Sequence, residues 1–70
     1  MNLTNAQAGR EYIVKHIATG DEEMDAFLFS LGCYSGEPST VVSHKPGICL
    51  VSIKDGRYTM DRQLARTIEI

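Results

Sequence analysis

Two histidines and two cysteines are the residues of this chain best suited to metal binding or nucleophilic chemistry: His16, His44, Cys33 and Cys49. None of them stands at a C-x-x-C or H-x-x-x-H spacing, which would fix a metal site locally. We therefore expect no metal site and no metal requirement. His16 is interpreted as a strand residue, His44 as an exposed turn residue, and both cysteines as buried thiols of a protein in a reducing compartment.

The sequence contains no recognisable pattern of catalytic or nucleotide-binding residues. A cysteine nucleophile requires a histidine brought close by the fold and a lowered thiol pKa. The carboxylates between Asp21 and Asp25 are interpreted as the solvated start of a helix rather than a cation site. The glycines lie in turns and form neither a phosphate loop nor a dinucleotide fingerprint. No catalytic residue, cofactor or enzymatic activity is predicted.

Length and charge narrow the class of protein and partner. Seventy residues make one domain, 1–70, with room for one sheet and one helix around a small core. Seven basic and nine acidic residues give a net charge of -2, so the chain lacks the positive stripe that nucleic acid requires. No apolar run predicts a signal or membrane segment. We expect a cytoplasmic monomer or weak homo-oligomer that binds no nucleic acid and does not insert into a membrane.

One stretch, from Thr19 to Gly36, carries a clear helical pattern. Four apolar residues recur at i, i+3, i+4 and i+7 and share one stripe: Met24, Phe27, Leu28 and Leu31. This stripe is expected to be buried. Phe29 falls on the opposite side of the helical wheel, where either a neighbouring loop or a partner must cover it.

Both ends of this helix carry recognisable signals. Thr19 with Glu22 fits a capping box, and Asp21 is a competing N-cap residue. Gly32 follows the last apolar position and is expected to adopt the left-handed conformation that often ends a helix. The chain should then return to a sheet.

Short runs rich in β-branched and aromatic residues predict the strands. Residues 10–17 form the first predicted strand. Its alternation of apolar and polar residues is imperfect, because Tyr12, Ile13 and Val14 are consecutive. This irregularity indicates a bulge or a strand that is covered on both faces. Further along, the pattern predicts a strand over 40–43 entered through Glu37 and Pro38, a turn over 44–47, a helical turn over 62–66 capped by Asp61, and a last strand over 67–70.

The segment from Ile48 to Met60 has the strongest hairpin signal. Asp55 and Gly56 between two alternating runs predict a type I′ turn. Such a turn would pair Lys54 with Arg57, Ile53 with Tyr58, Ser52 with Thr59, and Val51 with Met60. One face of the sheet would then carry the apolar members of these pairs, and Lys54 would face a like charge.

Taken together, these elements predict a mainly β fold with one helix inserted after the first strand. About five short strands can remove their exposed edges by curling into a small barrel, and the apolar stripe of the helix can close one open end.

The order of these features resembles the FeoA family, small cytosolic proteins of the bacterial ferrous iron transport system. The resemblance covers nearly the whole chain and rests on Ala8-Gly9, on Phe29-Ser30-Leu31-Gly32 and Gly36, and on the segment 51–58 leading to Leu64-Ala65-Arg66-Thr67-Ile68. It implies an SH3-like barrel with an inserted helix. The chain departs from the family pattern at Ser39, where a β-branched apolar residue is common, and at Glu37-Pro38.

The resemblance also implies a partner. FeoA-like proteins are adaptors for FeoB, a membrane iron transporter with a cytosolic GTP-binding domain, and stimulation of the GTPase has been proposed for the family. Arg57 or Arg10 would be the residue to reach the phosphates, although an exposed arginine is usually just solvated. The alternative is an SH3-like regulatory domain of an iron-dependent repressor. This chain contains no DNA-reading helix, and its start at Met1 favours the adaptor.

A partner surface can be predicted from the apolar residues that neither the helix stripe nor the hairpin face uses. Phe29 and Tyr34 flank the corner at Gly32. The predicted rim is positive and consists of Lys45, Pro46, Lys54 and Arg57, which would face an acidic partner. The competing interpretation is that the N-terminal segment around Leu3 covers Phe29 and that Tyr34 is a residue at the edge of the core.

Overall fold

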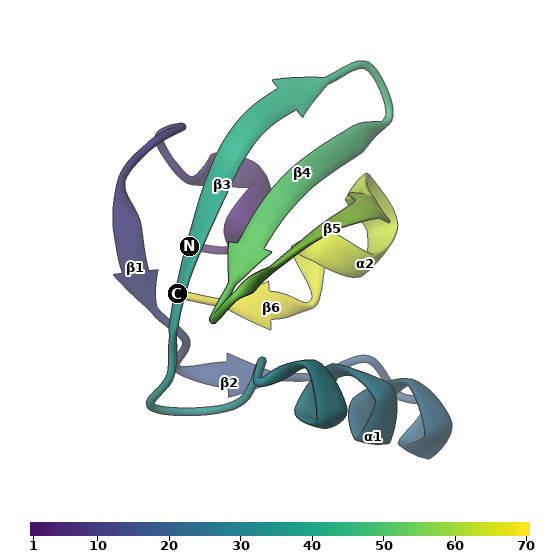
Figure 1. Ribbon diagram of the computed structural model, residues 1–70. Helices are drawn as coiled ribbons and strands as arrows, with labels where there is room; N and C mark the ends of the chain where they lie inside the picture. Colours follow the sequence, from purple (N-terminus) through teal and green to yellow (C-terminus); the bar gives the residue numbers. More distant parts are fainter.

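Strands are the commonest regular elements of the computed structural model, which describes residues 1–70 (Figure 1). The elements in chain order are the 3-10 helix η1 (Leu3–Asn5), β1 (Glu11–Ile13), β2 (His16–Ile17), α1 (Glu22–Leu31), β3 (Pro38–Lys45), β4 (Ile48–Ile53), β5 (Gly56–Asp61), α2 (Arg62–Arg66) and β6 (Ile68–Glu69). The prediction of a mainly β fold with one longer helix is confirmed. No helix has the length and apolar character needed to cross a bilayer.

The strands form two antiparallel sheets and do not close into a barrel. One sheet has the order β1-β3-β4-β5, and the other pairs β2 with β6. The prediction of a closed barrel is therefore wrong, because β1 and β5 remain as edges of the larger sheet. The two ends of the chain lie side by side (Figure 1), where the N–H of Ile70 donates to the carbonyl of Met1 at 2.9 Å.

The first predicted strand is divided between these two sheets. Val14 lies between β1 and β2 and is 1% exposed, whereas the preceding Ile13 is 53% exposed. The N–H of Val14 donates to the carbonyl of Glu37, and its carbonyl accepts from the N–H of Gly36. The run of three apolar residues therefore marks a bend from one sheet to the other, not a bulge or a strand covered on both faces.

The turn between β4 and β5 differs from the predicted one. Ile53 pairs with Gly56, so the turn residues are Lys54 and Asp55. Of these only Lys54 has a positive φ, 52°, which excludes a type I′ turn. The predicted pairing of Lys54 with Arg57 is wrong, and no like charges face each other there.

The apolar face of this hairpin is nevertheless the predicted one. Val51 pairs with Tyr58 and Cys49 with Met60, so each partner is shifted by two residues from the prediction. A shift of two preserves the face because side chains alternate with a period of two. Gly56 provides space at this end, since a Cβ atom there would collide with the ring of Tyr58.

The other hairpin extends the predicted strand in both directions. Pro38 is the first residue of β3, as expected for a proline at a strand entry. His44 and Lys45 belong to the strand, and the turn contains only Pro46 and Gly47. The prediction of a turn over 44–47 is therefore wrong in its first half.

The helix α1 begins and ends at predicted residues but buries less than predicted. Asp21 is the N-cap and accepts from the N–H of Glu23 at 2.9 Å, so the capping box at Thr19 does not form. Gly32 has a φ of 94°, which confirms the left-handed end. Of the predicted stripe only Leu28 is fully buried, and Phe27 is 53% exposed. The helix lies beyond the turn end of β4 and β5 (Figure 1), where the sheet offers too little surface to cover the stripe.

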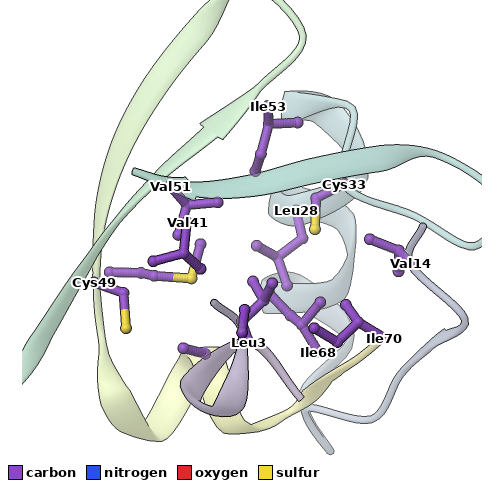
Figure 2. Close-up of a cluster of buried hydrophobic side chains, with 13 residues drawn as sticks. Leu3, Val14, Leu28, Cys33, Val41, Cys49, Val51, Ile53, Ile68 and Ile70 are labelled. Atoms are coloured by element: carbon purple, nitrogen blue, oxygen red, sulfur yellow. The ribbon is translucent and has the colours of Figure 1, made fainter. Parts of the chain in front are cut away.

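A single apolar core joins the two sheets to η1, α1 and α2. Thirteen buried residues form it, and Figure 2 shows side chains from both sheets converging beside Leu28. They are Leu3, Ala6, Val14, Leu28, Cys33, Val41, Cys49, Val51, Ile53, Met60, Ala65, Ile68 and Ile70. The prediction that both cysteines are buried thiols is confirmed. α2 closes the core and is capped by Asp61 as predicted, with its carboxylate accepting from the N–H of Leu64 at 2.7 Å.

Candidate partner-binding site

Two aromatic rings pack together at the end of α1. Phe29 lies in the last turn of the helix and is 62% exposed. Tyr34 lies in the connection to β3, and its ring centroid is 4.6 Å from that of Phe29, with an interplanar angle of 30°. The left-handed residue Gly32 reverses the chain between them. Because such ring pairs contribute about 0.5–1.5 kcal/mol beyond area burial, the two rings hold each other in place.

A polar edge fixes the tyrosine of this aromatic pair. Tyr34 and Glu37 share a side-chain hydrogen bond, which raises the pKa of Tyr34 and lowers the pKa of Glu37. The other partner of Glu37 is Lys54, whose Nζ lies 3.3 Å from Oε2. The aliphatic part of Lys54 passes over Gly32, where an added Cβ would lie 2.7 Å from Cε. The charge of Lys54 is therefore compensated, and it does not form a free positive rim.

A second apolar surface lies on the other side of α1. Phe27 and Leu31 line a groove of about 250 Å³ together with residues of β5 and α2. Arg57 stands at this groove and has no acidic partner, because the two ion pairs of the structure are Lys54 with Glu37 and the N-terminus of Met1 with Glu69. The guanidinium of Arg57 thus has no acidic partner and lies beside the exposed apolar groove at Phe27 and Leu31.

The structure brings together only some of the residues predicted for the partner surface. Phe29, Tyr34 and Lys54 form one cluster, and Arg57 lies at the groove across α1. Lys45 and Pro46 lie at the opposite end of the β3–β4 hairpin, as the pairing of Lys45 with Ile48 shows. They cannot rim the aromatic pair.

The exposure of Phe29 decides between the two interpretations of its surroundings. At 62% exposure, the ring is not covered by the N-terminal segment, whose Leu3 instead lies in the core at 0% exposure. The interpretation of Phe29 as a covered residue is wrong.

Phe27 and Leu31 are the surface residues that the sequence analysis missed. Their helical spacing assigned them to the core. A signal was present in the composition of α1, which carries apolar residues on more than one face: Met24, Ala26, Phe27, Leu28, Phe29 and Leu31. One small sheet cannot cover all of them.

The histidine, cysteine and acidic side chains of the chain form no metal-binding cluster of three or more, although Nδ1 of His44 lies 3.6 Å from Sγ of Cys49. No group of three His, Cys, Asp or Glu side chains lies close enough together to hold a metal ion. Burial raises the pKa of the Cys33 thiol to about 11, the opposite of what a thiolate nucleophile needs. Asp21 and Asp61 line a surface pocket between α1 and α2, but both carboxylates already serve as helix N-caps.

Comparisons with known proteins show the family of this chain and a solved structure with a similar fold. A family model of the FeoA domain matches residues 1–70, the whole chain, which confirms the resemblance seen in the sequence. A solved chain described as a manganese-dependent transcriptional repressor is similar to this one with a TM-score of 0.84 and 20% identity, over 97% of this chain and 39% of that chain. At that identity the likeness shows the fold alone, and it supports an SH3-like architecture without barrel closure. No curated protein matches the chain.

Proposed function

The chain belongs to the FeoA domain family, and from this premise we propose that it is a cytoplasmic accessory protein of ferrous iron uptake. Membership of the family supports a role in ferrous iron transport. The proposed partner is the cytosolic GTP-binding part of a FeoB-like transporter. In this proposal the chain contributes a binding surface and no enzymatic chemistry.

The observation that carries the proposal is the exposed and ordered aromatic pair at the end of α1. Phe29 leaves most of its ring in contact with solvent, which costs free energy unless another molecule covers it. Aromatic anchors of this kind dominate the binding energy of many protein interfaces. Phe29 and Tyr34 are therefore the proposed anchors.

The surroundings of the pair reduce the cost of binding. Tyr34 is held by Phe29 on one side and by Glu37 on the other, and Lys54 in turn holds Glu37. Side chains that are already ordered lose little conformational entropy in a complex, where each mobile side chain would lose about 0.5–1.5 kcal/mol. Arg57 has no ion-pair partner, but it lies at the groove across α1 from the aromatic pair and is not one of the proposed anchors.

A direct role of an arginine at the phosphates of the partner is less well supported. The guanidinium of Arg10 lies 5.4 Å from the centre of the Tyr12 ring, so it already has an interaction within the chain. Arg57 has no ion-pair partner, but it stands beside an apolar groove that suits a side chain better than a nucleotide.

A regulatory domain of a metal-dependent repressor is the second candidate, favoured by the shared fold of the repressor described above. Such a domain would act together with a DNA-binding part. The 70 residues supply only α1, whose first turn is acidic, and the five-residue α2 as helices of the α type. α1 lacks the positive charge that a DNA-reading helix directs toward the phosphates. α2 carries Arg62 and Arg66 but is only five residues long.

Titration by calorimetry against the cytosolic domain of a FeoB-like transporter tests the first candidate. The domain should be measured nucleotide-free, with GDP, and with a non-hydrolysable GTP analogue. We expect saturable binding to the transporter domain in at least one of these states. We expect no binding to a DNA-binding repressor fragment measured in the same way. Absence of binding in all three states would overturn the proposal, and binding to the repressor fragment alone would establish the second candidate.

A further inference from the structure

Three side chains that can bind a transition-metal ion stand in one row across the larger sheet. His44 of β3 pairs directly with Cys49 of β4, and Cys49 pairs directly with Met60 of β5. Residues directly opposite each other in an antiparallel sheet point to the same face, with Cβ atoms about 4.5–5.5 Å apart. An imidazole, a thiol and a thioether are therefore neighbours on one face, a relationship that no spacing along the chain reveals.

The hydrogen bonds of His44 leave one ring nitrogen available at the cysteine. Nε2 lies 2.8 Å from the carbonyl oxygen of Ala6, and because a carbonyl only accepts, Nε2 carries the hydrogen. In the neutral ring Nδ1 then has a free lone pair, and it lies 3.6 Å from Sγ of Cys49. Histidine ligands of metals almost always donate their other N–H in this way, to a carboxylate or a backbone carbonyl.

The distance between the two donor atoms suits a shared metal ion. A tetrahedral metal about 2.3 Å from a sulfur and about 2.0 Å from a nitrogen separates those two ligand atoms by about 3.5 Å. The observed separation of Sγ and Nδ1 is 3.6 Å. The pair can therefore bind one ion without backbone movement, once the thiol proton between them has left.

The chemistry and the burial of these three side chains favour a monovalent, soft metal ion over a divalent one. Cys49 is 0% and Met60 5% exposed, and the set contains no carboxylate. A thiolate with a monovalent cation gives a neutral unit, whereas a divalent cation would leave a net positive charge among apolar side chains, which is costly. Thiolate and thioether sulfurs also prefer copper(I) to harder ions. We propose that His44, Cys49 and Met60 form a binding site for copper(I).

Binding follows from a simple exchange at this site. The thiol of Cys49 releases its proton to solvent, and its sulfur binds copper(I) without any change of oxidation state. Nδ1 of His44 exchanges its contact with the thiol for a bond to the metal. Nε2 keeps its hydrogen bond to the carbonyl oxygen of Ala6. His44 is solvent-exposed, so the ion enters from that side. The bound metal would tie the N-terminal segment to three strands of the sheet.

Anaerobic titration of the whole chain with copper(I), in competition with a coloured copper(I) chelator, tests the proposal. We expect one ion per chain and a near-ultraviolet band from the copper–thiolate bond. Cys49→Ala should abolish the band and the tight binding, and His44→Ala and Met60→Leu should each weaken the affinity at least tenfold. Circular dichroism and melting curves must show that each variant is folded.

Cys33 provides the matched control. It is also a buried free thiol, but it lies on the other side of the core cluster from Cys49 (Figure 2). Cys33→Ala should leave the stoichiometry, affinity and band unchanged. Unchanged binding by a folded Cys49→Ala variant, or loss of binding in Cys33→Ala instead, would overturn the site. Equally tight binding of zinc(II) would overturn the choice of a monovalent ion.

Discussion

The ring of Phe29 packs on the ring of Tyr34 with their centroids 4.6 Å apart, and the turn between them depends on Gly32. The backbone of Gly32 is left-handed, and its missing side chain leaves room for the aliphatic part of Lys54. Lys54 then reaches Glu37, which binds the hydroxyl of Tyr34. The conformation of one glycine is thus connected to the order of the proposed binding surface.

Gly32→Val should lower the free energy of unfolding by at least about 1 kcal/mol, because a side chain at positive φ is strained. The new Cβ would also lie 2.7 Å from Cε of Lys54. Chemical denaturation measures the effect. Gly32→Ala in a Lys54→Ala background removes the collision but keeps the strain, so it separates the two causes. An unchanged midpoint for Gly32→Val would contradict this account of the helix end.

Ser39→Ala should stabilise the fold. Ser39 is 2% exposed and its hydroxyl has no hydrogen-bond partner, and an unsatisfied buried polar group costs about 1–3 kcal/mol. The expected gain is up to about 1 kcal/mol, since a small gap replaces the hydroxyl. Thermal and denaturant unfolding would show it. Ser43→Ala on the same strand, where the side chain is only half-buried, is the control, and a destabilised Ser39→Ala would refute the interpretation.

Acid should weaken the fold partly through Glu37. Its pKa is lowered from 4.5, chiefly by the hydrogen bond with Tyr34 and next by that with Lys54. A carboxyl with a lowered pKa in the folded state stabilises above its unfolded pKa, and this contribution is lost as the pH falls through the folded value. Melting temperatures between pH 7 and pH 3 should therefore fall less below about pH 4.5 in Glu37→Gln than in the wild type.

Glu11→Gln serves as the control for this pH dependence, because Glu11 is exposed and makes no ion pair. Its curve should follow that of the wild type. Parallel curves for the wild type and Glu37→Gln would show that the hydrogen bonds of Glu37 do not contribute.

A strong chelator should leave the melting temperature unchanged. The thirteen buried apolar residues close the core without a metal ion, and the hydrogen bonds of His44 satisfy the ring when no ion is bound. Scanning calorimetry with and without EDTA tests this. A fall of many degrees would mean that the fold depends on a metal, and the two histidines and two thiols would be the residues to examine.

Local patterns predicted the elements well but not their relation in space. Asp21, Gly32 and Asp61 carry their capping roles in their own chemistry, so each could be assigned from the sequence. The register of β4 and β5 could not, because a shift of two residues keeps the same alternation. It also depends on Lys54 adopting a positive φ, which a lysine rarely does.

Burial on α1 was overestimated for a related reason. Periodicity shows which residues share a face, but not how much surface the rest of the chain has to cover that face. Leu28 reaches the core, whereas Phe27 on the same stripe does not.

The candidate site was predictable to the same limited extent. Phe29 and Tyr34 stood out because no predicted element used them, and the short turn at Gly32 kept them close. Lys45 was assigned to the wrong end of the molecule because the direction of its hairpin relative to α1 is a tertiary property. The neighbourhood of His44 and Cys49 likewise depends on strand register.

The most direct test of the proposed binding surface is a titration of the transporter's cytosolic domain with the double variant Phe29→Ser with Tyr34→Ala, beside the wild type and Phe27→Ser. Phe27 is a comparably exposed aromatic residue on the same helix, so Phe27→Ser controls for the loss of apolar surface alone. We expect the double variant to keep its circular dichroism spectrum and nearly its melting temperature, while its Kd rises at least tenfold, about 1.4 kcal/mol. Phe27→Ser should bind much as the wild type does. Unchanged binding by the folded double variant, or a large loss of its stability, would contradict the claim that these two rings form the surface that meets the partner.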